Sequence, residues 1–109
     1  NINLNLNKMG VQIELFEGYE YPTTSQEEVL LTLILQGHVS IFDFPYLSGF
    51  RTRVSNLVVI YGLKLNRVLD SRTNKYGNSY KYAIHRLPAE EKEKAILLYK
   101  KLNKNYKNQ

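Results

Sequence analysis

The feature that most constrains the fold is a change in the spacing of apolar residues at Gly62. Before this glycine, apolar residues recur every three or four positions in two stretches, as they do along one face of a helix. After it, they alternate with polar residues, as they do in half-buried strands. Helices followed by a strand pair predict an α+β fold. The 109 residues have the length of a single domain.

The first predicted helix begins near Ser25 and ends at Gly37. Ser25 and Glu28 have the spacing of a capping box, in which each side chain accepts a hydrogen bond from an otherwise unpaired amide of the first turn. Gly37 is a typical helix stop. An apolar stripe lies between these residues and predicts that the helix is part of the core: Val29, Leu30, Leu33 and Ile34.

A helix-turn-helix arrangement is predicted for the next part of the chain. His38-Val39 is expected to be extended, and Ser40 with Asp43 three residues later predicts the start of a short helix. Ser48-Gly49 indicates a tight turn. A longer helix is then predicted over residues 50–61, and its core stripe consists of Val54, Leu57, Val58 and Tyr61.

After Gly62, the alternating residues predict a hairpin and a final helix. Leu63 and Leu65 mark the first strand, residues 70–79 a polar loop, and residues 80–84 the second strand. Pro88 suits the first turn of the last helix. Acidic residues near the start of this helix and lysines near its end favour its macrodipole. The tail, residues 103–109, is expected to fray.

The first residues alternate as well, with Ile2, Leu4 and Leu6 on one side, and they predict an N-terminal hairpin. A disordered tail is the competing interpretation, because an isolated hairpin is marginally stable. The predicted organisation is an N-terminal hairpin and linker over residues 1–24, a central domain over residues 25–87, and a C-terminal helix and tail over residues 88–109.

The charged residues are unevenly distributed along the chain. Residues 1–50 hold one Lys and six acids, a net charge of −5, whereas residues 51–87 hold eight Lys and Arg and one Asp, a net charge of +7. This asymmetry indicates a polyanionic partner, most often nucleic acid.

Several other classes of protein are excluded by composition and motif. The absence of Cys excludes a disulfide framework and a thiolate metal site and favours the cytoplasm. No apolar run approaches the ~20 residues of a membrane helix. His38 and His85 are isolated, and the Ser and Gly residues form no catalytic or phosphate-binding motif. We therefore expect no cofactor, no metal and no enzymatic activity.

Three segments resemble the winged helix-turn-helix DNA-binding domains of bacteriophages and mobile elements. These are residues 49–57, residues 62–65 and the basic hairpin that ends at residues 80–84. The family's Gly, Arg-hydrophobic pair, Leu and wing-entry Gly are matched here by Gly49, Arg53, Val54, Leu57 and Gly62.

This resemblance covers about residues 29–87, and its motifs are short and mostly structural. Val58 stands where the family often has a basic residue, so that one phosphate contact is not carried over. The resemblance implies a winged helix with an added N-terminal hairpin and C-terminal helix. It also implies double-stranded DNA binding, with transcriptional regulation as the expected role.

The candidate DNA-binding residues lie on the predicted helix and hairpin. On a helical wheel, Thr52, Ser55 and Asn56 lie opposite the core stripe, with Arg51 and Arg53 on the flanks. In a major groove, Asn pairs with adenine, Ser or Thr contacts several base edges, and Arg holds phosphates or reads guanine. The hairpin adds candidate phosphate contacts at Arg67, Arg72, Lys75 and Lys81.

The same residues have simpler explanations. The helix face is then an ordinary solvated face, and the charges of the hairpin prevent pairing of its edges with other strands. Tyr80 and Tyr82 share a strand face and are expected to pack rather than to stack on bases.

The alternative function is that of a protein-interaction module in a phage or mobile-element assembly, or of a host-inhibiting protein. Val58, Val59 and Ile60 favour this alternative if they are exposed together. The C-terminal helix has more apolar residues than one stripe needs. It either completes the core or provides a surface for a homodimer or a protein partner.

Overall fold

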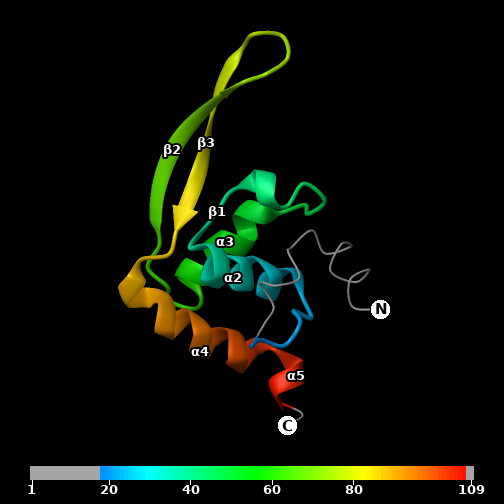
Figure 1. Cartoon of the computed structure of the whole chain (residues 1–109), viewed down its shortest axis with the longest axis vertical. Helices are drawn as coiled ribbons and strands as arrows, with labels where there is room; N and C mark the ends of the chain where they lie inside the picture. Colours follow the sequence, from blue (N-terminus) through cyan, green and yellow to red (C-terminus); the bar gives the residue numbers. More distant parts are fainter. Residues whose placement is uncertain (1–17, 108–109) are drawn as a thin grey trace.

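The computed structural model describes residues 18–107, and the predicted N-terminal hairpin lies outside this range. The described residues have an α+β fold with a three-stranded antiparallel sheet of order β1-β3-β2. Figure 1 shows the helices gathered at one end of the molecule and the β2–β3 hairpin projecting from them. The elements are α2 (Ser25–Gln36), β1 (His38–Val39), η2 (Ile41–Asp43), α3 (Phe50–Val59), β2 (Asn66–Thr73), β3 (Ser79–Arg86), η3 (Ala89–Glu91), α4 (Lys92–Leu102) and α5 (Lys104–Lys107).

The start of α2 lies where the sequence predicts it, but the predicted capping pair is wrong by one residue. Thr24, not Ser25, is the N-cap, and its hydroxyl accepts a hydrogen bond from the Glu27 amide at 3.1 Å. The Glu27 carboxylate reaches back and accepts from the Thr23 amide at 3.0 Å. Glu28 instead accepts a hydrogen bond from the Tyr46 hydroxyl. The cap shifts because Glu27 is the acid that has partners on the buried side of the helix.

The apolar stripe of α2 is buried as predicted, and the burial extends around the helix. Leu31 and Thr32 are buried together with the four predicted stripe residues. The helix contacts both α3 and α4, so more than one of its faces is covered. It ends at Gly37, whose positive φ of 84° lets its amide donate to the Leu33 carbonyl at 2.8 Å.

The segment between α2 and α3 follows the sequence prediction. The Ser40 and Asp43 side chains form a capping box, and the short helix that they start is a single 3-10 turn, η2. After the turn at Gly49, α3 buries Phe50, Val54 and Leu57.

Helix α3 is two residues shorter than predicted and ends at Val59. The Gly62 amide donates to the Val58 carbonyl at 3.1 Å, and the Leu63 amide donates to the Leu57 carbonyl at 2.9 Å. These two bonds close the C-terminal end of the helix, where Gly62 has a positive φ of 75°. Val58 is 42% exposed, so the predicted burial of Val58 is wrong.

The hairpin is longer than predicted. Residues 70–79 were predicted as a loop, but the two strands continue through most of them and pair from Asn66↔Arg86 to Thr73↔Ser79. The turn is confined to residues 74–78, where the Asn74 side-chain oxygen accepts from the Tyr76 amide at 2.9 Å and the Asn78 amide at 3.0 Å. The loop prediction fails because these strands are held by backbone pairing and not by apolar burial.

The C-terminal segment completes the core. Helix α4 packs on α2 and buries Ala95 and Tyr99. Asn103 is fully buried and its amide donates to the Glu27 carboxylate and the Tyr21 carbonyl, both at 2.7 Å. For residues 103–107 the predicted fraying is therefore wrong, since α5 follows this anchor, and residues 108–109 lie outside the described range. No helix within residues 18–107 is long and apolar enough to cross a membrane.

Candidate nucleic-acid interface

A groove of about 780 Å³ lies between α3 and the β2–β3 hairpin, with η2 at one end. Helix α3 lines it with Arg51, Ser55, Val58 and Val59. The hairpin contributes Arg67 and Leu69 from β2 and Tyr80, Lys81, Tyr82, Ala83 and His85 from β3. We call this feature the α3–hairpin groove.

Three predicted site residues converge on the α3–hairpin groove from three separate elements. Arg51 lies in the first turn of α3, Arg67 on β2 and Lys81 on β3. The strand register explains why Arg67 and Lys81 lie on one face of the hairpin. Arg67 pairs with His85 and Lys81 pairs with Ser71, and the side chains of all four residues are on the same face of the two strands. No Asp or Glu lines the groove. Its electrostatic potential is therefore positive.

His85 lines the groove without adding to its positive charge. Burial and then the charge of Arg67 lower the pKa of its imidazole below the usual 6.5. The ring lies 6.1 Å from the Phe50 ring, between the hairpin and the core. His85 is therefore neutral at pH 7, and the positive charge of the groove comes from Arg51, Arg67 and Lys81.

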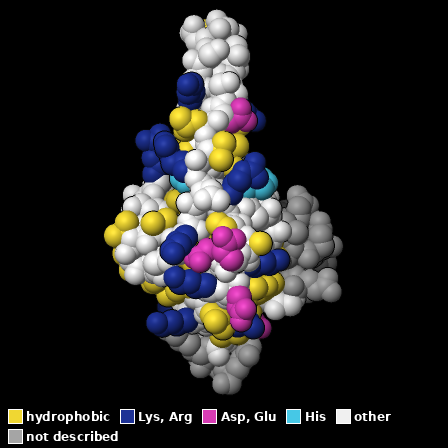
Figure 2. All heavy atoms as spheres, turned by 90° about the vertical axis from the view of Figure 1, so that its left-hand side faces the viewer, with side chains coloured by type: hydrophobic (Ala, Val, Ile, Leu, Met, Phe, Trp, Pro, Cys, Tyr) yellow, Lys and Arg dark blue, Asp and Glu magenta, His cyan; other side chains and the backbone are white. Residues whose placement is uncertain are grey.

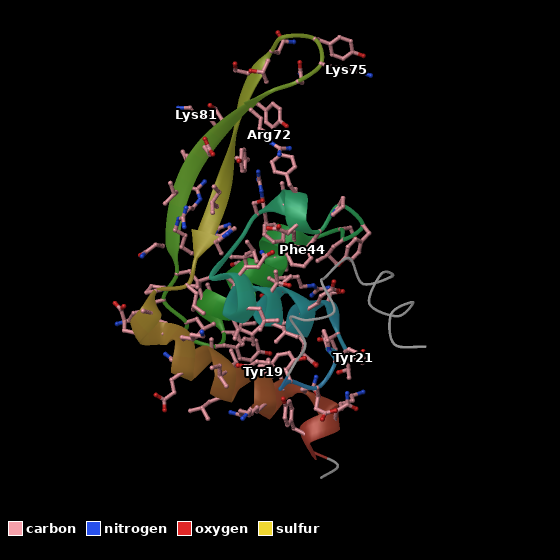
Figure 3. All side chains as sticks on the ribbon, viewed as in Figure 1. Tyr19, Tyr21, Phe44, Arg72, Lys75 and Lys81 are labelled. Atoms are coloured by element: carbon pink, nitrogen blue, oxygen red, sulfur yellow. The ribbon has the colours of Figure 1, made fainter. Side chains whose placement is uncertain are left out.

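Arg72 lies on the opposite side of the hairpin from Lys81, and Lys75 lies at its tip, as Figure 3 shows. The Arg72 guanidinium is 4.0 Å from the centre of the Phe42 ring, a cation–π contact. The same Phe42 ring contacts Tyr82 edge-to-face at 4.8 Å and Tyr80 at 6.5 Å. The packing prediction is confirmed for Tyr82, whereas Tyr80 is 41% exposed. The contacts of Phe42 connect the hairpin to η2.

Two of the predicted helix residues, Asn56 and Arg53, do not line the groove, and Asn56 faces α2. Asn56 is half-buried, and its side-chain amide donates to the Gln26 side chain at 3.3 Å. Gln26 in turn donates to the Arg53 carbonyl at 2.7 Å, and the Arg53 Nε atom is buried with no hydrogen-bond partner among the described residues. Thr52 is exposed but lines no part of the groove. A helical wheel of α3 alone does not show that Gln26 covers this flank.

Several acids of the described chain are used in the structure itself. Asp43 accepts from the Ser40 amide at 2.7 Å, Glu91 from the Lys64 amide at 2.9 Å, and Asp70 from the Ser71 amide at 2.8 Å. Glu27 is buried and hydrogen-bonded. Asp70 also accepts from the hydroxyl of the groove residue Tyr82 at 3.3 Å, but none of these four carboxylates lines the groove itself.

The exposed end of α3 is apolar. Val58, Val59 and Ile60 are 42%, 77% and 64% exposed. Their joint exposure is the feature that, in the sequence analysis, favours a protein-interaction module. Figure 2 shows Lys and Arg side chains on the lower half of the hairpin, with hydrophobic side chains between them, and a mixture of hydrophobic and charged side chains on the helical body beneath. Sequence analysis missed Leu69, Phe42 and His85 as groove residues. The alternation of Arg67, Leu69 and Ser71 along β2 is the signal that places Leu69 beside Arg67.

Comparisons with protein-family models, with curated proteins and with solved structures found no match for this chain. Among residues 18–107, no three His, Asp or Glu side chains lie together in a way that holds a metal ion. The interface is therefore interpreted from its own charge and geometry.

Proposed function

We propose that this chain is a winged-helix protein that binds double-stranded DNA through α3 and the β2–β3 hairpin, with transcriptional regulation as its role. The observation that carries the proposal is the convergence of Arg51, Arg67 and Lys81 on one groove without an acidic neighbour. Because the three cations come from three elements and line one groove, they form a continuous basic surface. Basic surfaces of this kind bind the phosphate backbone. Catalysis is not part of the proposal.

The hairpin has the dimensions and charge for a wing. It is a two-stranded ribbon of eight residues per strand, and β2 is exposed along its whole length. A ribbon of this kind fits a DNA groove or follows the backbone beside it. Lys75 at the tip lies beyond the α3–hairpin groove and adds a phosphate contact there, while the Phe42 contact holds Arg72 on the other face.

Helix α3 provides the base contacts in this proposal. Arg51, Thr52 and Ser55 are exposed in its first two turns. Its first turn has no side-chain cap among the described residues, so its amides favour a phosphate oxygen. The Asn56 contact with adenine is left out of the proposal, because Asn56 is occupied by Gln26.

A salt titration tests DNA binding. Fluorescence polarisation of a labelled duplex of mixed sequence is measured with the whole chain over a range of salt concentrations. We expect binding to weaken steeply with salt. We also expect an Arg67→Ala, Lys81→Ala double variant to flatten the slope of log affinity against log salt by about 1.8, or about 0.9 per lost phosphate contact.

The matched control is a Lys100→Ala, Lys101→Ala double variant. It removes the same charge from the last turn of α4, which does not line the groove. Its slope should equal that of the unchanged chain. Absence of duplex affinity at low salt, or equal loss of slope in both variants, contradicts the proposal.

A further inference from the structure

The α3–hairpin groove has an aliphatic surface that DNA binding does not use. Val58 and Val59 from α3 and Leu69 from β2 line it, and all three are exposed to solvent. Two of these side chains are on a helix and one is on a strand that the chain brings opposite that helix. Aliphatic side chains from separate elements that face one another across a groove, with polar residues around them, are typical of a binding site for a protein segment.

The size of the groove admits inserted side chains. At about 780 Å³ it has room for several side chains of a peptide. The apolar part needs aliphatic or aromatic side chains, which the DNA backbone lacks.

The charges around this apolar surface indicate which charge a bound segment should carry. Arg51, Arg67 and Lys81 line the same groove, and no acidic side chain lines it. A segment that buries apolar side chains here also needs carboxylates for these cations. Asp70 accepts a hydrogen bond from the hydroxyl of the groove residue Tyr82 at 3.3 Å, but it does not itself line the groove. A partner segment that carries carboxylates therefore complements the charge of the groove.

We propose that the α3–hairpin groove binds a short acidic peptide segment of a partner protein. Its apolar side chains contact Val58, Val59 and Leu69, and its carboxylates lie beside Arg51, Arg67 and Lys81. This proposal does not depend on DNA binding, because it rests on the aliphatic surface as well as on the cations.

A synthetic peptide tests the groove directly. The probe is a fluorescein-labelled peptide of repeated Leu-Glu-Glu-Leu units, about four helical turns long, and its polarisation is measured with the whole chain. We expect saturable binding. Val59→Asp should weaken it by about tenfold or more, because it places a carboxylate among the cations and removes apolar contact.

Leu97→Asp is the matched control. Leu97 is an aliphatic side chain on α4 that is 62% exposed and lies outside the groove, so both variants replace an exposed aliphatic side chain by one carboxylate. Leu97→Asp should leave the peptide affinity within about twofold. Equal weakening by both variants, or no binding of the peptide, overturns the proposal.

The charge of the peptide and the oligomeric state complete the test. A peptide in which Lys replaces every Glu should not bind, and Lys75→Ala, which removes a cation from the hairpin tip, should leave binding of the acidic peptide unchanged. The same Lys75→Ala variant should lower duplex affinity, which separates this proposal from DNA binding. Self-association of the chain that Val59→Asp abolishes, measured by light scattering, overturns the proposal because the occupant is then a second copy.

Discussion

The helical body and the β2–β3 hairpin are stabilised in different ways. The buried apolar residues of the described chain come from α2, α3, α4 and the segments between them, and none comes from β2 or β3. The hairpin depends on its backbone ladder, on its turn at residues 74–78 and on the Phe42 cluster at η2.

This difference separates stability from binding. The cations Arg67 and Lys81 are presented by strands that bury no core residue, so their substitution changes the surface without removing core packing. The body keeps α3 in place beside the hairpin and thereby fixes the shape of the groove. Changes in the body should therefore act mainly on the free energy of unfolding, and changes in the hairpin mainly on binding.

The largest expected contrast is between two leucines. Leu30 is fully buried in α2, and Leu69 is half-exposed on β2. Leu30→Ala should lower the free energy of unfolding by about 2–5 kcal/mol, since it leaves a cavity in a packed core. Leu69→Ala should lower it by less than about 1 kcal/mol. Urea unfolding of both variants measures the difference, and equal losses would show that the hairpin shares the core.

A smaller contrast is expected between two asparagines. Asn103→Ala removes the buried amide that donates to the Glu27 carboxylate and the Tyr21 carbonyl, each at 2.7 Å. It should cost about 1–3 kcal/mol of unfolding free energy because it leaves buried acceptors without a donor. Asn66→Ala, at the exposed start of β2, should cost much less. If the two variants unfold at the same urea concentration, the Asn103 contacts do not anchor the C-terminal segment.

The smallest expected effect is the pH dependence at His85, where the hairpin meets the body. Its pKa in the folded chain is lowered by burial and by Arg67 below 6.5. As pH falls through about 6.5, the unfolded chain binds more protons than the folded chain, so the free energy of unfolding decreases. His85→Gln should remove this part of the pH dependence, and His38→Gln, at an exposed position of β1, serves as the control. Urea unfolding at several pH values gives the comparison, and an unchanged profile in His85→Gln would contradict it.

The sequence predicts the body better than the hairpin, for a physical reason. The stop at Gly37 and the capping box at Ser40 and Asp43 depend on residues that are near one another in the chain, and both are confirmed. The length of the hairpin was underestimated because polar strands carry little apolar alternation. The backbone ladder that extends them is independent of side-chain type.

The candidate site was predicted in part. The groove is lined by three predicted residues, Arg51, Arg67 and Lys81. The helical wheel predicts the exposed position of Arg51, and the strand alternation predicts that Arg67 and Lys81 lie on the hairpin surface. Asn56 turns toward Gln26 and Arg72 stacks on Phe42, and these contacts join elements that are distant in sequence. A periodicity within one element cannot show such contacts. The exposed aliphatic residues Val58 and Val59 lie at the C-terminal end of α3, which ends two residues earlier than predicted.

The buried position of Asn103 also has a consequence for the order in which the chain folds during synthesis. Its partners Tyr21 and Glu27 lie 82 and 76 residues earlier, so their contacts close only after most of the chain has been made. The strand partners of the hairpin are close in sequence, so its backbone pairing can form before the C-terminal residues are synthesised. A ribosome-bound intermediate that ends before Asn103 should therefore contain a formed hairpin on an unfinished helical body.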